Sequence, residues 1–316
     1  MERTKALLLG AGALGVFFTS KLAAAGVETA VAARSDHDAA RDRGYEIDDR
    51  GMVVRFRPDH VIRRASECPF TPDYVIVAAK VLPEIRPEEL AAGLPLSDST
   101  VIVLIQNGIG IEAPFARQFP KQEILSAVAY LCASRPESGK VVNTGPGKLE
   151  MGSWPAGAPS PAARRLAELF AAGGAPCRLL DNVQTARWRK LLWNVPFNPV
   201  SVLAGGADTG WLCDGAECEK LCRDLMDEVI AAAASEGIVI AREEADAMMA
   251  YTRSLTPYNS SMLQDYLAGR PLEVEAILGN TLRIARENGV SVPKMETCYA
   301  LLKSVDALRR KQRRPS

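Results

Sequence analysis

Lys190, Asn194 and Asn198 lie four residues apart in a segment rich in tryptophan and leucine. Residues at i and i+4 share one face of a helix, so Lys190 and Asn194 are expected side by side, joined by Asn198 if the helix continues past Pro196. An ordinary lysine, with a reference pKa of about 10.4, is protonated at neutral pH. Such an ammonium could stabilise the alkoxide formed when hydride reaches a ketone and then donate its proton. The structural alternative is a lysine extending from an amphipathic helix into water.

The histidine content favours Lys190 in that role. His37 and His60 are the only histidines, and both lie early in the chain. We therefore expect a lysine, tyrosine, cysteine or carboxylate to carry the proton if the chain is an enzyme.

Two other polar groups occur in the same half of the chain. Ser260 and Ser261 stand at a predicted helix start, where serine is a common cap and where a hydroxyl with free N–H groups would also suit a substrate carboxylate. Glu273 and Glu275 point to different faces of a predicted helix, so at most one of them is expected to face a site. Glu273 falls in the first turn, where the helix dipole stabilises a carboxylate in any case.

A glycine motif near the start predicts a dinucleotide site. An apolar run leads into Gly10-Ala11-Gly12-Ala13-Leu14-Gly15, followed by an alanine-rich helix and a second apolar strand. In such a unit Gly10 permits the tight turn, Gly12 leaves room for the pyrophosphate, and Gly15 lets the helix pack closely on the strand. The helix N-terminus supplies N–H groups to the anion. A signal peptide over residues 6–18 is the alternative, disfavoured by the glycines and the second strand.

The residues after the second strand indicate which dinucleotide binds. A carboxylate there usually accepts hydrogen bonds from the ribose of NAD, whereas an arginine meets the 2′-phosphate of NADP. This chain has Arg34 and Ser35, and Asp36 lies beyond the strand end. The pattern favours NADP(H), with a solvated loop arginine as the alternative.

Composition limits the class of protein. The chain has 316 residues, enough for two domains, and its 38 basic and 38 acidic residues balance. We therefore expect no nucleic-acid or membrane partner, and we interpret the basic cluster over residues 309–314 as a solvated tail. The seven scattered cysteines lack metal-ligand spacing and predict no metal, reduced thiols and a cytoplasmic location. The oligomeric state stays open, with a homodimer as one option.

The first 182 residues alternate apolar runs with short helical segments, which predicts a parallel, doubly wound Rossmann-type sheet. Ligands of such sheets bind beyond the carboxyl ends of the strands. Lys80 and Asn107 stand at two of these ends, so both are expected to contact the cofactor.

Residues 139–152 are predicted to form a hairpin around Gly145-Pro146-Gly147. Beyond Asn182 helical periodicity dominates, which predicts an all-α C-terminal domain over residues 183–316 and an α/β chain as a whole. The segments with this period are 183–195, 215–236, 241–254, 272–288 and 293–310.

At this point the chain resembles the ketopantoate reductase (2-dehydropantoate 2-reductase) family over essentially its whole length. The most specific motifs are the Trp188-Arg189-Lys190 segment with Asn194, and Ser260-Ser261-Met262-Leu263-Gln264-Asp265. The other matching features are the glycine loop, Arg34, Lys80, Gln106-Asn107-Gly108-Ile109-Gly110 and Glu273.

The resemblance implies a Rossmann domain, a helical domain and NADPH-dependent reduction of a 2-keto acid. It implies that Lys190 is the proton donor, that Asn194 and Asn198 bind substrate, and that Ser261 holds the substrate carboxylate. Glu273 corresponds to an acid that reaches the site and fixes Lys190 or the bound cofactor. The residues corresponding to cofactor contacts are Lys80, Asn107 and Ala133.

Two substrate-side positions depart from the family pattern. Tyr258 stands where an asparagine often precedes the serine pair, and Asp208 aligns loosely with another asparagine. The leading hypothesis is reduction of ketopantoate to pantoate on the way to pantothenate and coenzyme A. The alternatives are another 2-keto acid reductase, a 3-hydroxyacid dehydrogenase-like enzyme, and a non-catalytic NADP-binding redox sensor.

Overall fold

The computed structural model describes residues 2–312, which form two compact units. The first unit comprises the chain up to Lys80 together with Glu84–Asn107 and Ile111–Gln184. The second contains the chain from Thr185 and two short segments, Val81–Pro83 and Gly108–Gly110. The predicted fold class is confirmed: the first unit holds a Rossmann-like sheet and the second is helical.

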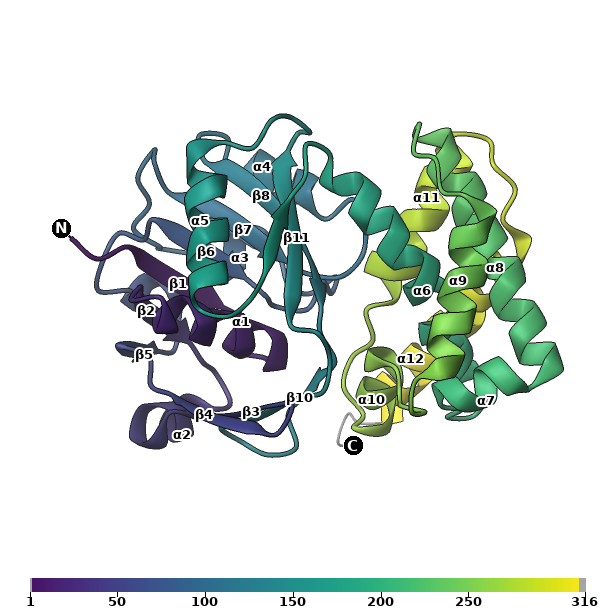
Figure 1. The fold of residues 1–316 in the computed structure, drawn as a ribbon, viewed down its shortest axis with the longest axis horizontal. Helices are drawn as coiled ribbons and strands as arrows, with labels where there is room; N and C mark the ends of the chain where they lie inside the picture. Colours follow the sequence, from purple (N-terminus) through teal and green to yellow (C-terminus); the bar gives the residue numbers. More distant parts are fainter. Residues whose placement is uncertain (1, 313–316) are drawn as a thin grey trace. The chain divides into compact units, whose positions relative to one another are not determined.

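An eight-stranded sheet forms the centre of the first unit (Figure 1). In spatial order its strands are β12 (Cys177–Leu179), β11 (Lys148–Trp154), β8 (Glu123–Tyr130), β7 (Val101–Ile105), β6 (Tyr74–Val77), β1 (Lys5–Leu9), β2 (Glu28–Ala32) and β5 (His60–Ile62). All neighbouring strands are parallel except β11 and β8. The chain order runs outward from β1 in both directions, so the topological switch point lies between β1 and β6.

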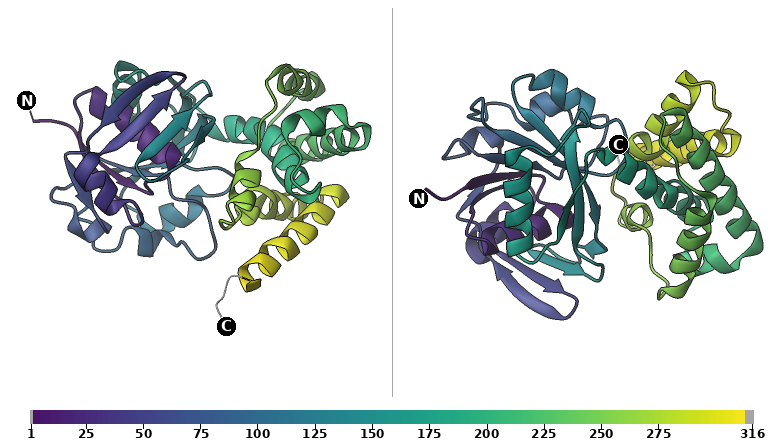
Figure 2. Two further views of the ribbon diagram at one scale, coloured as in Figure 1. Left: turned by 90° about the horizontal axis from the view of Figure 1, so that it is seen from below. Right: turned by 45° about the horizontal axis from the view of Figure 1, so that its top comes forward.

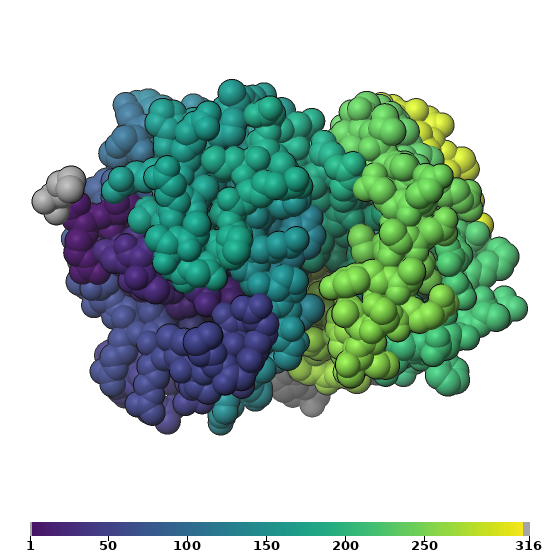
Figure 3. All heavy atoms as spheres, viewed as in Figure 1, coloured from purple at the N-terminus to yellow at the C-terminus, as the bar shows by residue number. Residues whose placement is uncertain are grey.

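A second sheet of four strands packs near the helix α1 (Ala13–Ala24). Its strands are β4 (Met52–Phe56), β3 (Tyr45–Asp49), β10 (Lys140–Asn143) and β9 (Ala133–Ser134). Because α1 contacts strands of both sheets, residues on all its sides are buried, including the consecutive run Gly15–Ser20. A helix enclosed in this way needs apolar residues all round, which is the composition that this segment has. Figure 3 shows residues 40–60, in blue-violet, on the outer surface of this unit.

The remaining helices of the first unit are short, apart from one. They are α2 (His37–Arg43), the 3₁₀ turn η1 (Ala65–Glu67), α3 (Pro87–Leu90), α4 (Glu112–Gln118) and α5 (Pro161–Ala172). The longest, α5, begins with Pro161 at its first position, and the Ser160 hydroxyl accepts a bond from the Ala163 amide at 3.0 Å. This cap and the proline explain why the helix starts there.

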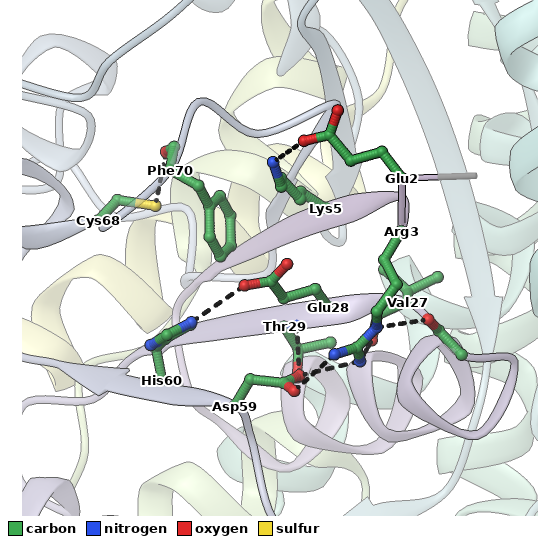
Figure 4. A network of polar contacts seen from close by, with 11 residues as sticks. Glu2, Arg3, Lys5, Val27, Glu28, Thr29, Asp59, His60, Cys68 and Phe70 are labelled. Atoms are coloured by element: carbon green, nitrogen blue, oxygen red, sulfur yellow. Dashed lines mark hydrogen bonds and ion pairs between the residues drawn. The ribbon is translucent and has the colours of Figure 1, made fainter.

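A polar network fixes the edge strand β5 against β2 (Figure 4). Asp59 accepts bonds from the Thr29 amide at 2.8 Å and from the Arg3 guanidinium at 3.0 Å. His60 on β5 contacts Glu28 on β2 at 3.1 Å. Burial alone would raise the pKa of Asp59, but the bonds from Thr29 and Arg3 outweigh it and lower the pKa, so this carboxylate stays charged at neutral pH.

The second unit is a set of helices packed around α8 (Ala216–Ser235). The others are α6 (Val183–Leu203), α7 (Thr209–Asp214), α9 (Arg242–Ser254), α10 (Ser261–Leu267), the π-helical turn η2 (Glu275–Gly279), α11 (Asn280–Glu287) and α12 (Pro293–Gln312). The buried Glu228 of α8 accepts bonds from the Lys294 and Met295 amides at 2.9 and 2.7 Å. A carboxylate at a helix N-terminus satisfies free amides there, which fixes the start of α12 on α8.

The predicted hairpin over residues 139–152 is wrong. Its two strands belong to different sheets: β10 pairs with β3 and β9, whereas β11 pairs with β8 and β12. The turn between them instead bonds to the end of β8, with the Gly147 amide donating to the Tyr130 carbonyl at 3.0 Å. Turn residues show that the chain reverses, but they do not show which strand becomes the partner.

The basic cluster near the C-terminus is more structured than predicted. Arg309 and Arg310 lie within α12, drawn in yellow in Figure 2. The Arg309 guanidinium packs 3.8 Å from the ring centre of Tyr266, and Arg310 pairs with Asp306 at 2.8 Å. Arg313 and Arg314 lie outside the described residues. Within residues 2–312, no helix is long and apolar enough to cross a membrane.

A buried ion pair links α1 to the small sheet, and we expect it to make the stability of the fold depend on pH. Asp49 at the end of β3 pairs with Lys21 of α1 at 2.9 Å and accepts a bond from the fully buried Asn143 at 2.9 Å. Burial alone would raise the pKa of Asp49, but the bonds from Lys21 and Asn143 outweigh it and lower the pKa. This stabilisation is present above the pKa of the unfolded carboxyl and is lost as the pH falls through the lower folded value.

We expect Asp49→Asn to reduce the free energy of unfolding by about 1–3 kcal/mol at pH 7. Denaturant titrations at pH 7 and pH 3 should show that the gap to the wild type narrows in acid. The control is Asp48→Asn, because an asparagine there still accepts the bond from the Gly51 amide, at 2.8 Å from Asp48. A gap of equal size at both pH values would contradict the role of the Asp49 charge.

Candidate active site

The glycine loop has the geometry that a dinucleotide requires. Gly10 has a φ of 101°, and a Cβ added there would lie 2.3 Å from the Ala79 nitrogen. A Cβ on Gly15 would lie 2.4 Å from the Gly10 carbonyl oxygen, whereas a Cβ on Gly12 would meet nothing within 4 Å. No side chain caps the first turn of α1, and this turn contains no acidic residue. The loop is therefore closed against its own sheet and open toward an anion.

The residues predicted at strand ends lie beyond three adjacent strands. Gly10, Lys80 and Asn107 follow β1, β6 and β7, which are neighbours in the sheet. The amide of Gln106 donates to the Ala79 carbonyl at 2.5 Å and so connects the ends of β7 and β6. The parallel register therefore places all three residues at the carboxyl edge beside the switch point.

The segment after β2 carries an exposed arginine and a buried carboxylate. Arg34 is exposed, and it makes no hydrogen bond or ion pair with any residue between 2 and 312. Asp36 is buried, and its carboxylate is bonded to Arg135 and to the Ser138 hydroxyl, the latter at 3.1 Å. The carboxylate near this strand end is thus engaged by protein groups, and the guanidinium is available for an anion.

Ala133 lies on the two-residue strand β9, which contacts α1. The next residue but one, Arg135, donates from Nη1 to the Ala11 carbonyl of the glycine loop at 2.9 Å. No motif in the sequence indicates this role of Arg135. The only available signal was its closeness in sequence to Ala133.

In the second unit, α6 carries the predicted lysine and amides on one face. The helix continues through Pro196 and Pro199 as far as Leu203. Lys190 is half-buried, Asn194 is 3% exposed and Asn198 is fully buried. The Nδ2 of Asn194 and both polar atoms of Asn198 have no hydrogen-bond partner among the described residues. Buried amides are bonded in nearly all proteins, so these atoms without partners make the face a candidate site for a polar ligand.

The two serines of the pair differ: Ser260 is a buried helix cap, and Ser261 is exposed. Ser260 is buried and caps α10, with its hydroxyl accepting from the Leu263 amide at 3.1 Å. It also shares a hydrogen bond with Ser201 of α6 at 2.9 Å, a contact that the sequence did not predict. Ser261 is exposed at the first position of α10.

Glu273 and Glu275 bond to different parts of the second unit. The Glu275 carboxylate contacts the Tyr299 hydroxyl at 2.9 Å and Lys303 at 2.6 Å, both on α12. Glu273 is half-buried just before the helical turn, and its Oε1 accepts a bond from the Val81 amide at 2.9 Å. Glu275 therefore serves the packing of α12, as expected for one member of the pair.

Three contacts within the second unit hold the Gly108–Gly110 segment, which directly follows Asn107. The buried Arg187 donates to the Gly108 carbonyl at 2.9 Å, and Asn280 donates to the Ile109 carbonyl at 2.6 Å. The Ile109 amide donates to the Ala276 carbonyl of the π-helical turn. Gly108 has a φ of 96°, and a Cβ there would lie 2.3 Å from that carbonyl oxygen. The roles of Arg187 and Asn280 were not predicted, since no motif marks a contact made through the backbone.

Comparison with known proteins identifies the family. The model described as "Ketopantoate reductase PanE/ApbA" matches residues 6–156, and the one described as "Ketopantoate reductase PanE/ApbA C terminal" matches residues 182–306. A 2-dehydropantoate 2-reductase from a Nostoc species is 31% identical over 314 residues, which cover 98% of each chain. The chain belongs to the ketopantoate reductase family. It is an oxidoreductase that acts on a CH–OH group with a nicotinamide cofactor.

Solved structures agree with this assignment. The 2-dehydropantoate 2-reductase from Methylococcus capsulatus is 35% identical, with a TM-score of 0.88, and the match covers 96% of this chain and 97% of that one. The enzyme from Geobacter metallireducens is 31% identical, with a TM-score of 0.89 and coverage of 95% and 99%.

The two departures from the pattern of this ketopantoate reductase family have distinct structural roles. Asp208 caps α7 by accepting from the Trp211 amide at 2.9 Å. Tyr258 stacks on Trp193 with ring centres 6.1 Å apart and planes 3° from parallel. Trp193 also stacks on Phe197 at 5.0 Å. An aromatic group thus stands next to the face that carries the amides.

Asn198 provides a stability test of that face. A buried amide without a partner costs about 1–3 kcal/mol, so we expect Asn198→Leu to raise the free energy of unfolding by about 1 kcal/mol. The control is Asn143→Leu, because Asn143 is equally buried but bonds to Asp49 and Gly145, and its loss should destabilise the fold by about 2–3 kcal/mol. Denaturant titration measures both values. Equal destabilisation by the two variants would contradict an uncompensated amide at residue 198.

Proposed function

We propose that the chain reduces the 2-keto group of 2-dehydropantoate to (R)-pantoate with NADPH, a step toward pantothenate and coenzyme A. The observation that carries the proposal is the α6 face on which Lys190 lies beside two buried amides without partners. A face with such amides is costly for stability, which is understandable if a polar substrate bonds to them. The names of the similar proteins support ketopantoate as that substrate.

The chain divides into two functional parts under this proposal. Residues 1–182 form the NADP-binding domain, and residues 183–316 form the helical substrate and catalytic domain. The cofactor contacts are the glycine loop with Arg34, Lys80, Asn107 and Ala133. We further place the protein in the cytoplasm and propose that it assembles as a homodimer.

NADP(H) is favoured by the residues after β2. The exposed Arg34 can pair with the 2′-phosphate, and the carboxylate of Asp36 is engaged by other groups. The first turn of α1 has no side-chain cap and no acidic residue, so its amides are suited to bind the pyrophosphate. The residues present therefore fit this cofactor, which supplies a hydride when it is bound.

Lys190 is the proton donor in the proposed mechanism. Its ammonium stabilises negative charge on the substrate oxygen and delivers one proton to it, so the C=O group gains a hydride at carbon and a proton at oxygen. Asn194 and Asn198 donate hydrogen bonds that orient the keto acid. Ser261 holds the carboxylate, and Glu273 fixes the ammonium or the cofactor.

A second candidate is a reductase of a bulkier 2-keto acid. The stacked Tyr258 and Trp193 motivate it, because aromatic side chains next to the amides are able to contact a large side group. Shared architecture does not decide between these substrates.

The substrate is tested by measuring NADPH oxidation with ketopantoate, 2-ketoisovalerate, pyruvate and phenylglyoxylate. Ketopantoate differs from 2-ketoisovalerate by a hydroxymethyl group, and a site that bonds this hydroxyl should prefer ketopantoate by about 100-fold or more in kcat/KM. A higher kcat/KM for phenylglyoxylate than for ketopantoate would show that the substrate is an aromatic 2-keto acid. Absence of turnover with all four would leave a cofactor-binding protein without this activity.

Lys190→Met tests the proton donor. We expect kcat to fall by about 10²–10⁴-fold, because general acid catalysis is lost, while the Kd for NADPH stays within about two-fold. Lys220→Met is the control, since Lys220 is an exposed lysine of the same unit that pairs with Asp224 on one helix. Stopped-flow turnover and fluorescence titration separate the two effects. A Lys190→Met variant with near-normal kcat would remove this residue from the mechanism.

A further inference from the structure

Asp36 is the first carboxylate after β2 and lies two residues beyond Arg34, and its side chain is buried in the protein. It is the residue before α2, a position where aspartate usually caps the helix, but its side chain makes no cap bond. The side chain is only 5% exposed. Arg135, the Ser138 hydroxyl at 3.1 Å and the Gly139 amide at 3.4 Å donate to its two oxygens.

Arg135 connects this carboxylate to the glycine loop. One terminal nitrogen of its guanidinium pairs with Asp36, and the other donates to the Ala11 carbonyl at 2.9 Å. Ala11 lies between the two glycines on which the turn depends, and Asp36 lies two residues after Arg34. One side chain therefore acts on both places where a dinucleotide is recognised.

We propose that the Arg135–Asp36 pair sets the preference for NADPH over NADH. This inference rests on the proposed role of Arg34 as the 2′-phosphate partner. The pair neutralises the Asp36 charge and holds the carboxylate away from the ribose edge. A 2′-phosphate beside Arg34 then meets no uncompensated anion, whereas NADH has no phosphate there for the Asp36 charge to repel. Arg135 is a positioning residue, since it acts through Asp36 and the loop.

The test is the equilibrium binding of NADPH and NADH to the full-length protein, followed by fluorescence titration and checked by calorimetry. Arg135→Met leaves the Asp36 charge unpaired, and we expect the Kd for NADPH to rise about ten-fold while that for NADH stays within about two-fold. The double variant Asp36→Asn with Arg135→Met should recover most of the NADPH preference, because the unpaired charge is gone. Arg64→Met, which removes an exposed arginine paired with Glu67, is the control.

The outcomes separate this proposal from simpler explanations. Equal weakening of both nucleotides by Arg135→Met would mean a structural role only, and absence of recovery in the double variant would overturn the charge argument. If Arg135→Met does not fold, the variants Arg135→Lys and Asp36→Asn test the role of the pair in its place. Both should keep the NADPH preference within about two-fold, and a selective loss of NADPH in Asp36→Asn would overturn the proposal.

Arg34→Ala distinguishes failure of this inference from failure of the proposed cofactor. If Arg34→Ala leaves the preference unchanged, the 2′-phosphate is not read by Arg34 and the proposal of NADP(H) at this position falls. If Arg34→Ala abolishes the preference and Arg135→Met does not alter it, only the role of the pair is overturned.

Discussion

The close approach of the glycine loop to the end of β6 is the constraint on which the first unit depends. Gly10 adopts a left-handed conformation with no room for a side chain against Ala79, and Gly15 touches the Gly10 carbonyl. These contacts set how α1 leaves β1, and α1 in turn packs between two sheets. The open space at Gly12 and the uncapped helix start follow from the same turn. A single local geometry thus creates the packing of the unit and leaves the start of α1 open, as an anion-binding loop requires.

In the second unit, one face of α6 is packed in the apolar core and the neighbouring face buries polar side chains. Trp188, Leu191 and Leu192 of this helix are buried in the apolar core and hold it rigidly. The neighbouring face buries two amides without partners among the described residues, which lowers stability. Rigid support for polar groups that await a ligand is a common compromise at binding sites.

Sequence reasoning succeeded where chemistry and spacing are local. The i, i+4 spacing of Lys190 and Asn194 placed them on one face of a helix that the structure contains. It failed where a choice of partner decides the outcome. The turn at Gly145–Gly147 was recognised, but β10 and β11 do not pair with each other: β10 pairs with β3 and β9, and β11 pairs with β8 and β12. Arg135 was missed because its contacts lie 99 and 124 residues away along the chain.

The sequence by itself determined the cofactor fold, the helical second half, the family and the residue types available for chemistry. These features depend on periodicity, turn residues and motifs within short windows. Only the tertiary structure decided that Ser260 also bonds to Ser201 of α6, that Glu275 contacts α12, and that Asp36 is bonded to Arg135. Each of these roles depends on which distant group reaches the side chain first, and no local pattern contains that information.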